Sequence, residues 1–309
     1  MQWGGGKGIY VAGRGDVWYT GGRKGENMRF DCHMHMILDG TDYKKAIGRH
    51  SQGADVEFIR RTLAEYQRLG YGYLRDGGDR WGAGKMARSL AGEYGICYRT
   101  PLSPLCKRGH YGGFIGEVYE NFREYGALVE KQRRDGADFI KIMISGLMDF
   151  NRFGVLSEEG LSAGEIRELI HIAHEEGFAV MAHANGARTV QAAAEAGVDS
   201  VEHGAYLDGE ALAAMAAGGV VWVPTLSAIG NLQGKGRFEE DAVKRILDSS
   251  LANVAAYGEM GGLVACGSDA GAWAVTHGCD TEMHWLQQAL GQEAEAVAQR
   301  GNRAVLEKF

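Results

Sequence analysis

Residues 30–36 read FDCHMHM, a short apolar run that carries two histidines one residue apart. In a β-strand, side chains two positions apart point to the same side, so His33 and His35 would present their imidazole rings together. The pair predicts either a metal site or two buried histidines whose nitrogens bond to backbone groups. Segments farther along the chain decide between these interpretations.

Runs of β-rich sequence alternate with amphipathic helical patterns from residue 29 onward, and several of the helical patterns end in glycine, as helices commonly do. Repeated strand–helix units predict an α/β fold, and eight of them favour a (β/α)₈ TIM barrel over the alternative of an open doubly wound sheet. The expected strands lie at 30–36, 71–78, 96–104, 138–146, 178–184, 199–205, 220–227 and 263–271.

The two predicted parts of the chain are a barrel over residues 29–309 and an N-terminal extension over residues 1–28. The extension is rich in glycine, but it shows neither the strand nor the helix that a dinucleotide-binding GxGxxG motif requires. We therefore expect hairpins and loops there rather than a nucleotide site.

The composition suggests a cytoplasmic enzyme that acts on a small molecule. A net charge of -7 argues against a nucleic-acid partner. The five cysteines form no CxxC pair, as expected of reduced thiols, and neither a signal peptide nor a membrane-spanning apolar stretch is apparent. The sequence leaves open whether the protein forms a homo-oligomer.

Four further polar residues fall where the later strands are expected to end. Lys141 sits in an apolar run where a free ammonium would be costly to bury, and His183, His203 and Asp269 end the expected fifth, sixth and eighth strands. Each could be structural by itself. Together with the histidine pair, however, they would meet at the carboxyl ends of the strands, where barrel enzymes place their active sites.

This set of residues resembles the pattern of the amidohydrolase superfamily, with HxH on strand one, lysine on strand four, histidines on strands five and six, and aspartate on strand eight. The sequence around these positions is similar to that of the imidazolonepropionase-like and prolidase-like branch, over roughly residues 29–290. The similar segments are GHYGG (109–113), GADFIKIMISG (136–146), AHANGARTVQAAAEAGVDSVEHGAYLD (182–208), VPTL (223–226) and GSDAG (267–271).

The resemblance implies two divalent metal ions, expected to be zinc, bridged by a carbamate that carbon dioxide forms on Lys141. It assigns His33, His35 and Asp269 to one ion. His183 and His203 are assigned to the other ion. A hydroxide that bridges the metals would attack an amide carbonyl, and Asp269 would act as the proton shuttle.

The resemblance says least about which substrate this chain recognises, because the loops after strands four and eight differ from the pattern of the branch. We also expect little or no flanking β-sandwich, which relatives usually carry. An amide bond in a dipeptide or an N-acyl amino acid is the expected target, with His110 and Tyr206 as candidate substrate contacts. A lactonase or organophosphate esterase, and a catalytically silent scaffold relative, are the alternatives.

Overall fold

Eight parallel strands follow one another around the fold in chain order. The computed structural model describes residues 9–12, 16–19 and 28–309. The strands are β3 (Arg29–Met34), β4 (Tyr71–Asp76), β5 (Cys97–Arg99), β8 (Ile140–Met143), β9 (Val180–Ala184), β10 (Ser200–His203), β11 (Val221–Val223) and β12 (Leu263–Val264).

Two connections close these strands into a ring. The third barrel strand is bent, so that β5 pairs with β4 while its continuation β6 (Leu105–Lys107) pairs with β8. On the other side, the amide of Cys32 donates to the carbonyl of Cys266 at 2.8 Å, and Met34 forms a parallel bridge with Ala270. The expected (β/α)₈ barrel is therefore confirmed.

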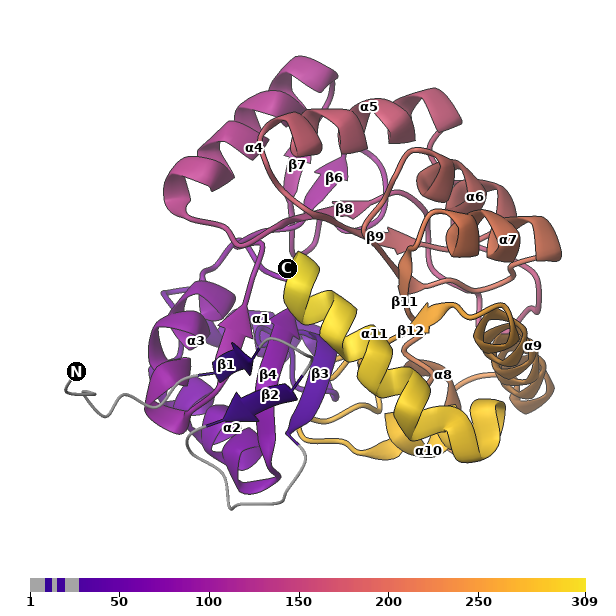
Figure 1. Ribbon diagram of the computed structural model, residues 1–309. Helices are drawn as coiled ribbons and strands as arrows, with labels where there is room; N and C mark the ends of the chain where they lie inside the picture. Colours follow the sequence, from indigo (N-terminus) through magenta and orange to yellow (C-terminus); the bar gives the residue numbers. More distant parts are fainter. Residues whose placement is uncertain (1–8, 13–15, 20–27) are drawn as a thin grey trace.

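Helices surround the ring, as Figure 1 shows. A short strand, β7 (Glu117–Tyr119), extends the sheet beside β6, and 3₁₀ turns occupy Gly92–Tyr94 and Gly291–Glu293. None of the described helices combines the length and apolar character needed to cross a membrane. The helices are α1 (Tyr43–Arg49), α2 (Val56–Arg68), α3 (Ala83–Ala91), α4 (Phe122–Asp135), α5 (Ala163–Glu175), α6 (Ala187–Glu195), α7 (Gly209–Ala217), α8 (Ser227–Gly230), α9 (Glu240–Glu259), α10 (Thr281–Leu290) and α11 (Ala294–Lys308).

Local sequence signals explain where several helices begin and end. The hydroxyl of Ser162 accepts a hydrogen bond from the amide of Glu165, and the carboxylate of Glu165 accepts one from the amide of Ser162. Helix α5 therefore begins with a capping box. At the other end of a helix, α4 stops at Gly136, which has a φ of 79° that glycine adopts without a steric penalty.

The inside of the barrel is layered. The lower layer, at the end of the ring that α11 crosses, is apolar. Phe139 and Met181 pack there with Val305 of α11 and with Phe309, which directly follows α11. Figure 1 shows α11, in yellow, crossing this end of the ring. Polar and charged side chains, among them Arg75, occupy the barrel above that layer and are buried as well. The apolar floor therefore separates these charged groups from solvent at the lower end.

Only part of the expected N-terminal extension falls within the described residues. Strands β1 (Ile9–Ala12) and β2 (Asp16–Tyr19) pair antiparallel, in line with a hairpin. Residues 1–8, 13–15 and 20–27 lie outside the described part of the chain, so the boundary at residue 28 stays a prediction.

Candidate metal centre

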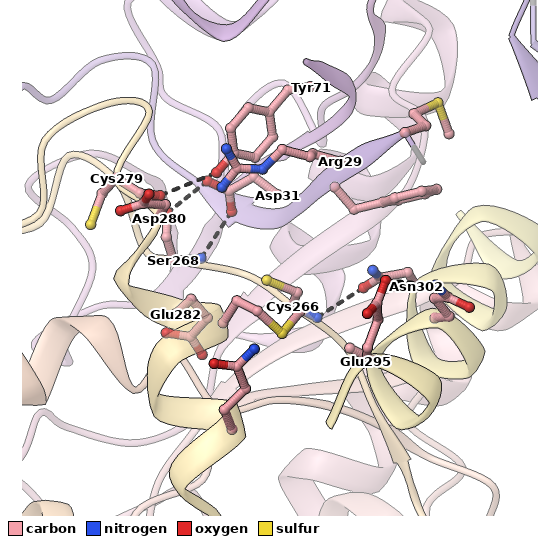
Figure 2. Close-up of a pocket in the computed structure, with 16 residues that line it drawn as sticks. Arg29, Asp31, Tyr71, Cys266, Ser268, Cys279, Asp280, Glu282, Glu295 and Asn302 are labelled. Atoms are coloured by element: carbon pink, nitrogen blue, oxygen red, sulfur yellow. Dashed lines mark hydrogen bonds between the residues drawn. The ribbon is translucent and has the colours of Figure 1, made fainter. Parts of the chain in front are cut away.

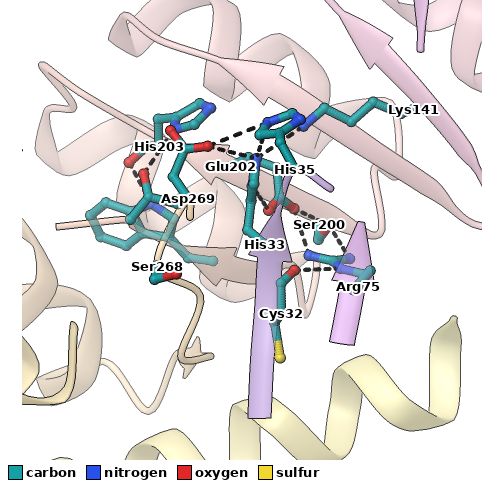
Figure 3. A network of polar contacts seen from close by, with 12 residues as sticks. Cys32, His33, His35, Arg75, Lys141, Ser200, Glu202, His203, Ser268 and Asp269 are labelled. Carbon is teal, nitrogen blue, oxygen red and sulfur yellow. Dashed lines mark hydrogen bonds and ion pairs between the residues drawn. The ribbon is translucent and has the colours of Figure 1, made fainter. Parts of the chain in front are cut away.

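Three side chains from the first and last barrel strands converge at the carboxyl end of the ring. The Nε2 atoms of His33 and His35 lie 3.3 Å apart. The Oδ1 atom of Asp269 is 3.5 Å from Nε2 of His33 and 3.3 Å from Nε2 of His35. Figure 3 shows these groups pointing toward one another. Two imidazoles and a carboxylate at such spacing form a donor set that suits zinc and similar divalent ions.

Lys141 reaches the same point from β8. Its Nζ atom is 3.4 Å from Nε2 of His33, and its side chain is buried. Burial lowers the pKa of Lys141 to about 8, although the carboxylates of Glu202 and Asp269 act in the opposite direction. The lysine therefore lies beside metal-ligand candidates in a setting that disfavours its ammonium form.

His183 and His203 complete the group of six. Their ring centroids lie 4.6 Å apart, and the ring of His203 lies 5.0 Å from that of His33. Nε2 of His183 is 3.3 Å from the carbonyl of Gly146. Because a carbonyl only accepts, Nε2 carries the hydrogen in that contact and Nδ1 keeps its lone pair. Nδ1 of His203 is 2.7 Å from the hydroxyl of Thr225.

The electrostatics of this cluster fit a bound cation. Burial, followed by the charge of Lys141, lowers the pKa of His33 well below its ordinary value and that of His183 to about 3. Burial, followed by the effect of His183, also lowers the pKa of His203. The Nδ1 atom of His35 is buried without a hydrogen-bond partner among the described residues. Neutral imidazoles are the form that ligates metals, so the residues present fit the implied ions.

Unusual backbone conformations bring two of these residues into position. His203 has a φ of 69° and Asp269 a φ of 59°, in the left-handed region that residues other than glycine seldom adopt. Neighbouring residues in a strand normally face opposite sides, yet both Glu202 and His203 contact or approach His33. The turn at His203 allows both side chains to reach the interior.

Sequence reasoning missed a buried polar network beneath the cluster. An Oε2 atom of Glu202 lies 2.7 Å from Nδ1 of His33, and Oε1 lies 2.8 Å from a guanidinium nitrogen of Arg75. Burial raises the pKa of Glu202, and the charge of Arg75 acts against that shift. The available signal was an arginine and a glutamate inside two apolar strands, where charges need partners.

The candidate substrate contacts occupy different surroundings. His110 is partly exposed, with Nδ1 3.5 Å from Oε1 of Glu158. Its neighbour Tyr111 packs against the ring of His183, with centroids 4.8 Å apart. Tyr206, which has a φ of 60°, packs edge-on against Phe153 at 5.4 Å. Tyr111, rather than His110, is thus the residue of this loop that touches a ligand candidate.

A cavity of about 290 Å³ lies at the outer wall of the barrel, between the start of β3 and helices α10 and α11. Figure 2 shows Asp31 and Ser268 on its lining. Ser268 donates from its amide and hydroxyl to Asp31, at 2.9 and 2.6 Å. This pair holds the loop that carries Asp269 against the strand that carries His33.

The sequence profile of the amidohydrolase family matches residues 100–300. An ochratoxinase of Aspergillus niger is 28% identical over 280 residues, covering 78% of this chain and 56% of the relative. An uncharacterized protein of Mycobacterium tuberculosis is 30% identical over 191 residues, covering 60% of this chain and 50% of the relative. The chain thus spans about half the length of the curated relatives it matches.

Solved structures share the fold at low sequence identity. A Xaa-Pro dipeptidase with methionine bound in its active site superposes with a TM-score of 0.71 at 19% identity, over 90% of this chain and 75% of that chain. The A. niger ochratoxinase gives 0.71 at 22% identity, over 89% and 70%. A prolidase complexed with N-methylphosphonate-L-proline gives 0.64 at 21% identity, over 90% and 71%.

Proposed function

Because the chain belongs to the amidohydrolase family, we propose that it is a metal-dependent hydrolase that cleaves the amide bond of a dipeptide or an N-acyl amino acid. One observation carries the proposal. At the carboxyl end of the barrel, the side chains of His33, His35, Lys141 and Asp269 are linked by contacts of 3.5 Å or less. That end is where barrel enzymes build their active sites.

The proposed centre holds two divalent ions, expected to be zinc. His33, His35 and Asp269 would bind one ion, while His183 and His203 would bind the other. When bound, the ions would polarise the amide carbonyl and lower the pKa of a water nucleophile. The lowered pKa values of these histidines support the assignment, because neutral imidazoles offer lone pairs without first losing a proton.

Lys141 is the proposed bridge between the two ions. As a neutral amine it can attack carbon dioxide, forming a nitrogen–carbon bond and releasing one proton. The resulting carbamate would offer two oxygens as ligands, so Lys141 would help to hold both ions. The position of Nζ beside Nε2 of His33 supports this role.

Asp269 is the proposed proton shuttle. Its carboxylate would take a proton from the water nucleophile and pass it to the nitrogen of the departing amine, so that the amine leaves neutral. The contacts of Oδ1 with both His33 and His35 keep the carboxylate at the cluster. His110 and Tyr206 remain proposed substrate contacts, and Tyr111 joins them because it packs on His183.

The substrate class rests on the relatives. A Xaa-Pro dipeptidase, a prolidase and an ochratoxinase all share this fold, and the first two names point to bonds between amino acids. We therefore expect a substrate in which an amino acid supplies the amine of the amide. The substrate would be a small molecule that enters from the carboxyl end of the barrel.

A hydrolysis screen tests the proposal. Zinc-loaded protein prepared with bicarbonate is offered dipeptides, N-acyl amino acids, lactones and phosphotriesters, with Asp269→Asn protein as the matched control. Release of amino acid from amides, lost after chelation, is the expected result. If only lactones or only phosphotriesters were hydrolysed, the amidase proposal would be wrong, and the protein would be a lactonase or an organophosphate esterase. No turnover by metal-loaded protein would favour a scaffold relative.

A further inference from the structure

The carboxylate of Glu202 contacts the imidazole of His33 inside the barrel. Oε2 of Glu202 lies 2.7 Å from Nδ1 of His33, and both side chains are fully buried. An ionised carboxylate only accepts, so Nδ1 of His33 carries the hydrogen. The lone pair of His33 is then on Nε2, the atom that faces His35, Lys141 and Asp269.

Arg75 in turn fixes the carboxylate. A terminal guanidinium nitrogen lies 2.8 Å from Oε1 of Glu202, Nε donates to the carbonyl of Cys32 at 2.7 Å, and the other terminal nitrogen donates to the hydroxyl of Ser200 at 3.0 Å. The same hydroxyl donates to Oε1 of Glu202 at 2.5 Å. Both carboxylate oxygens therefore have partners, and the guanidinium bonds to two other strands, β3 and β10, as Figure 3 shows.

Aromatic rings shield this pair from below. The guanidinium carbon of Arg75 lies 4.4 Å from the ring centroid of Phe309 and 5.9 Å from that of Phe139. The two rings pack edge-on, with centroids 5.3 Å apart. In such dry surroundings the attraction between the two charges is strong, and neither group can turn toward water.

We infer that Glu202 and Arg75 are positioning residues that hold His33 in the tautomer whose lone pair, on Nε2, faces the proposed metal centre. The inference rests on the proposed metal centre. It differs from that proposal because neither residue is a ligand candidate. Groups that accept the N–H hydrogen of a metal-bound histidine typically contribute 10- to 100-fold to metal affinity.

A purely structural role is the competing explanation, in which Glu202 only neutralises Arg75. Removing Glu202 alone cannot separate the two roles, because it would leave Arg75 buried without its counter-charge. Two double variants separate them. Arg75→Met with Glu202→Leu removes both charges and the acceptor, whereas Arg75→Met with Glu202→Gln removes both charges and keeps a carbonyl acceptor for His33.

The experiment has two readouts. Nitrogen-15 NMR of metal-free protein reports which nitrogen of His33 carries hydrogen, and chelator competition gives the affinity for Co²⁺. We expect the leucine variant to lose the single tautomer and to bind Co²⁺ about 10- to 100-fold more weakly. The glutamine variant should recover most of the single tautomer and most of the Co²⁺ affinity. Asp79→Asn is the matched control, because Asp79 is a buried carboxylate that accepts from the backbone of α3 instead of a ligand candidate.

The inference is overturned if the leucine variant keeps the Nδ1-protonated tautomer and binds Co²⁺ as tightly as the parent and the Asp79→Asn control. Equal losses in the glutamine and leucine variants would also overturn it, because an acceptor would then make no difference. A parent protein that binds no Co²⁺ would refute the proposed centre instead. The tautomer of His33 in metal-free protein would still test the positioning pair in that case.

Discussion

The amide of Asp269 donates a 2.7 Å hydrogen bond to the carbonyl of His33. This bond belongs to the seam where the last barrel strand meets the first, and each of its two residues also carries a side chain of the candidate centre. Ring closure and assembly of the donor cluster are therefore one structural event. A change that opens the seam should weaken metal binding even when every ligand is still present.

Metal content is the first test of the centre. Protein produced with zinc and bicarbonate should carry two divalent ions per chain, because five buried donor side chains and the partly buried His203 lie together there. Lys141→Ala should lower the metal content and abolish most activity, since it removes the proposed bridge. Short carboxylic acids added to this variant should partly restore both. Elemental analysis measures the content, and an unchanged Lys141→Ala protein would show that the lysine is structural.

Asp269→Asn should separate proton transfer from metal binding. Asparagine keeps the size and one ligating oxygen, but it cannot accept a proton at neutral pH. We expect kcat to fall by at least roughly 100-fold while the protein still folds and binds some metal. Steady-state kinetics and elemental analysis on the same preparation provide the check. A variant that holds two ions and keeps near-parental kcat would contradict the shuttle.

Gly267→Ala should disturb the seam without replacing a ligand side chain. A Cβ at this position would lie 2.5 Å from Cγ1 of Val223 and 2.7 Å from the amide nitrogen of His33. Overpacking of this kind typically costs about 1–3 kcal/mol in the free energy of unfolding. Metal affinity should fall as well, because His33 must move.

Gly164→Ala is the matched control for this substitution. A Cβ there meets nothing within 4 Å, and the residue lies in the first turn of α5. Alanine is a better helix former than glycine, so stability should stay equal or rise. Urea unfolding of both variants gives the comparison. Equal effects at the two positions would show that the seam tolerates the added carbon.

His277 should make stability depend on pH without taking part in proton transfer. Nε2 lies 2.9 Å from the carbonyl of Leu38 and Nδ1 lies 3.2 Å from the hydroxyl of Tyr66. Burial lowers the pKa of His277 to about 4, below the ordinary value near 6.5. The unfolded chain therefore binds the proton more readily, so this stabilisation is complete above pH 6.5 and is lost as pH falls toward 4.

His277→Gln should accordingly reduce the pH dependence. Glutamine can donate to Leu38 and accept from Tyr66, but it does not titrate. The stability advantage of the parent over the variant should shrink by roughly 2 kcal/mol between pH 7 and pH 5. Urea unfolding at both pH values measures the difference. An advantage that stays constant would show that His277 does not become protonated on unfolding in this range.

The barrel could be predicted because its signals are local and repeated. Each strand reads as a short apolar run followed by a helical pattern, and the polar residues that interrupt those runs fall at the strand ends. The spacing of His33 and His35 alone fixes that they share a face. The bend that divides the third strand into β5 and β6 was not predictable, because it depends on pairing with different neighbours on each side.

The pair Glu202 and His203 marks the limit of sequence reasoning at the site. Alternation along a strand assigns adjacent residues to opposite faces, so choosing His203 for the interior argued against Glu202. The left-handed φ of His203 overrides that rule, and the local sequence VEHG (201–204) does not predict this φ value. The position of Tyr111 against His183 likewise depends on how a loop folds back over the ring, which local sequence does not encode.

The closing seam also fixes when the centre can form during synthesis. Asp31 and His33 leave the ribosome 236 or more residues before their partners Ser268 and Asp269. Until then the edge of β3 has no neighbour on that side, and unpaired strand edges invite association with other chains. While those intervening residues are being made, a growing chain therefore carries His33 and His35 on an unprotected strand edge.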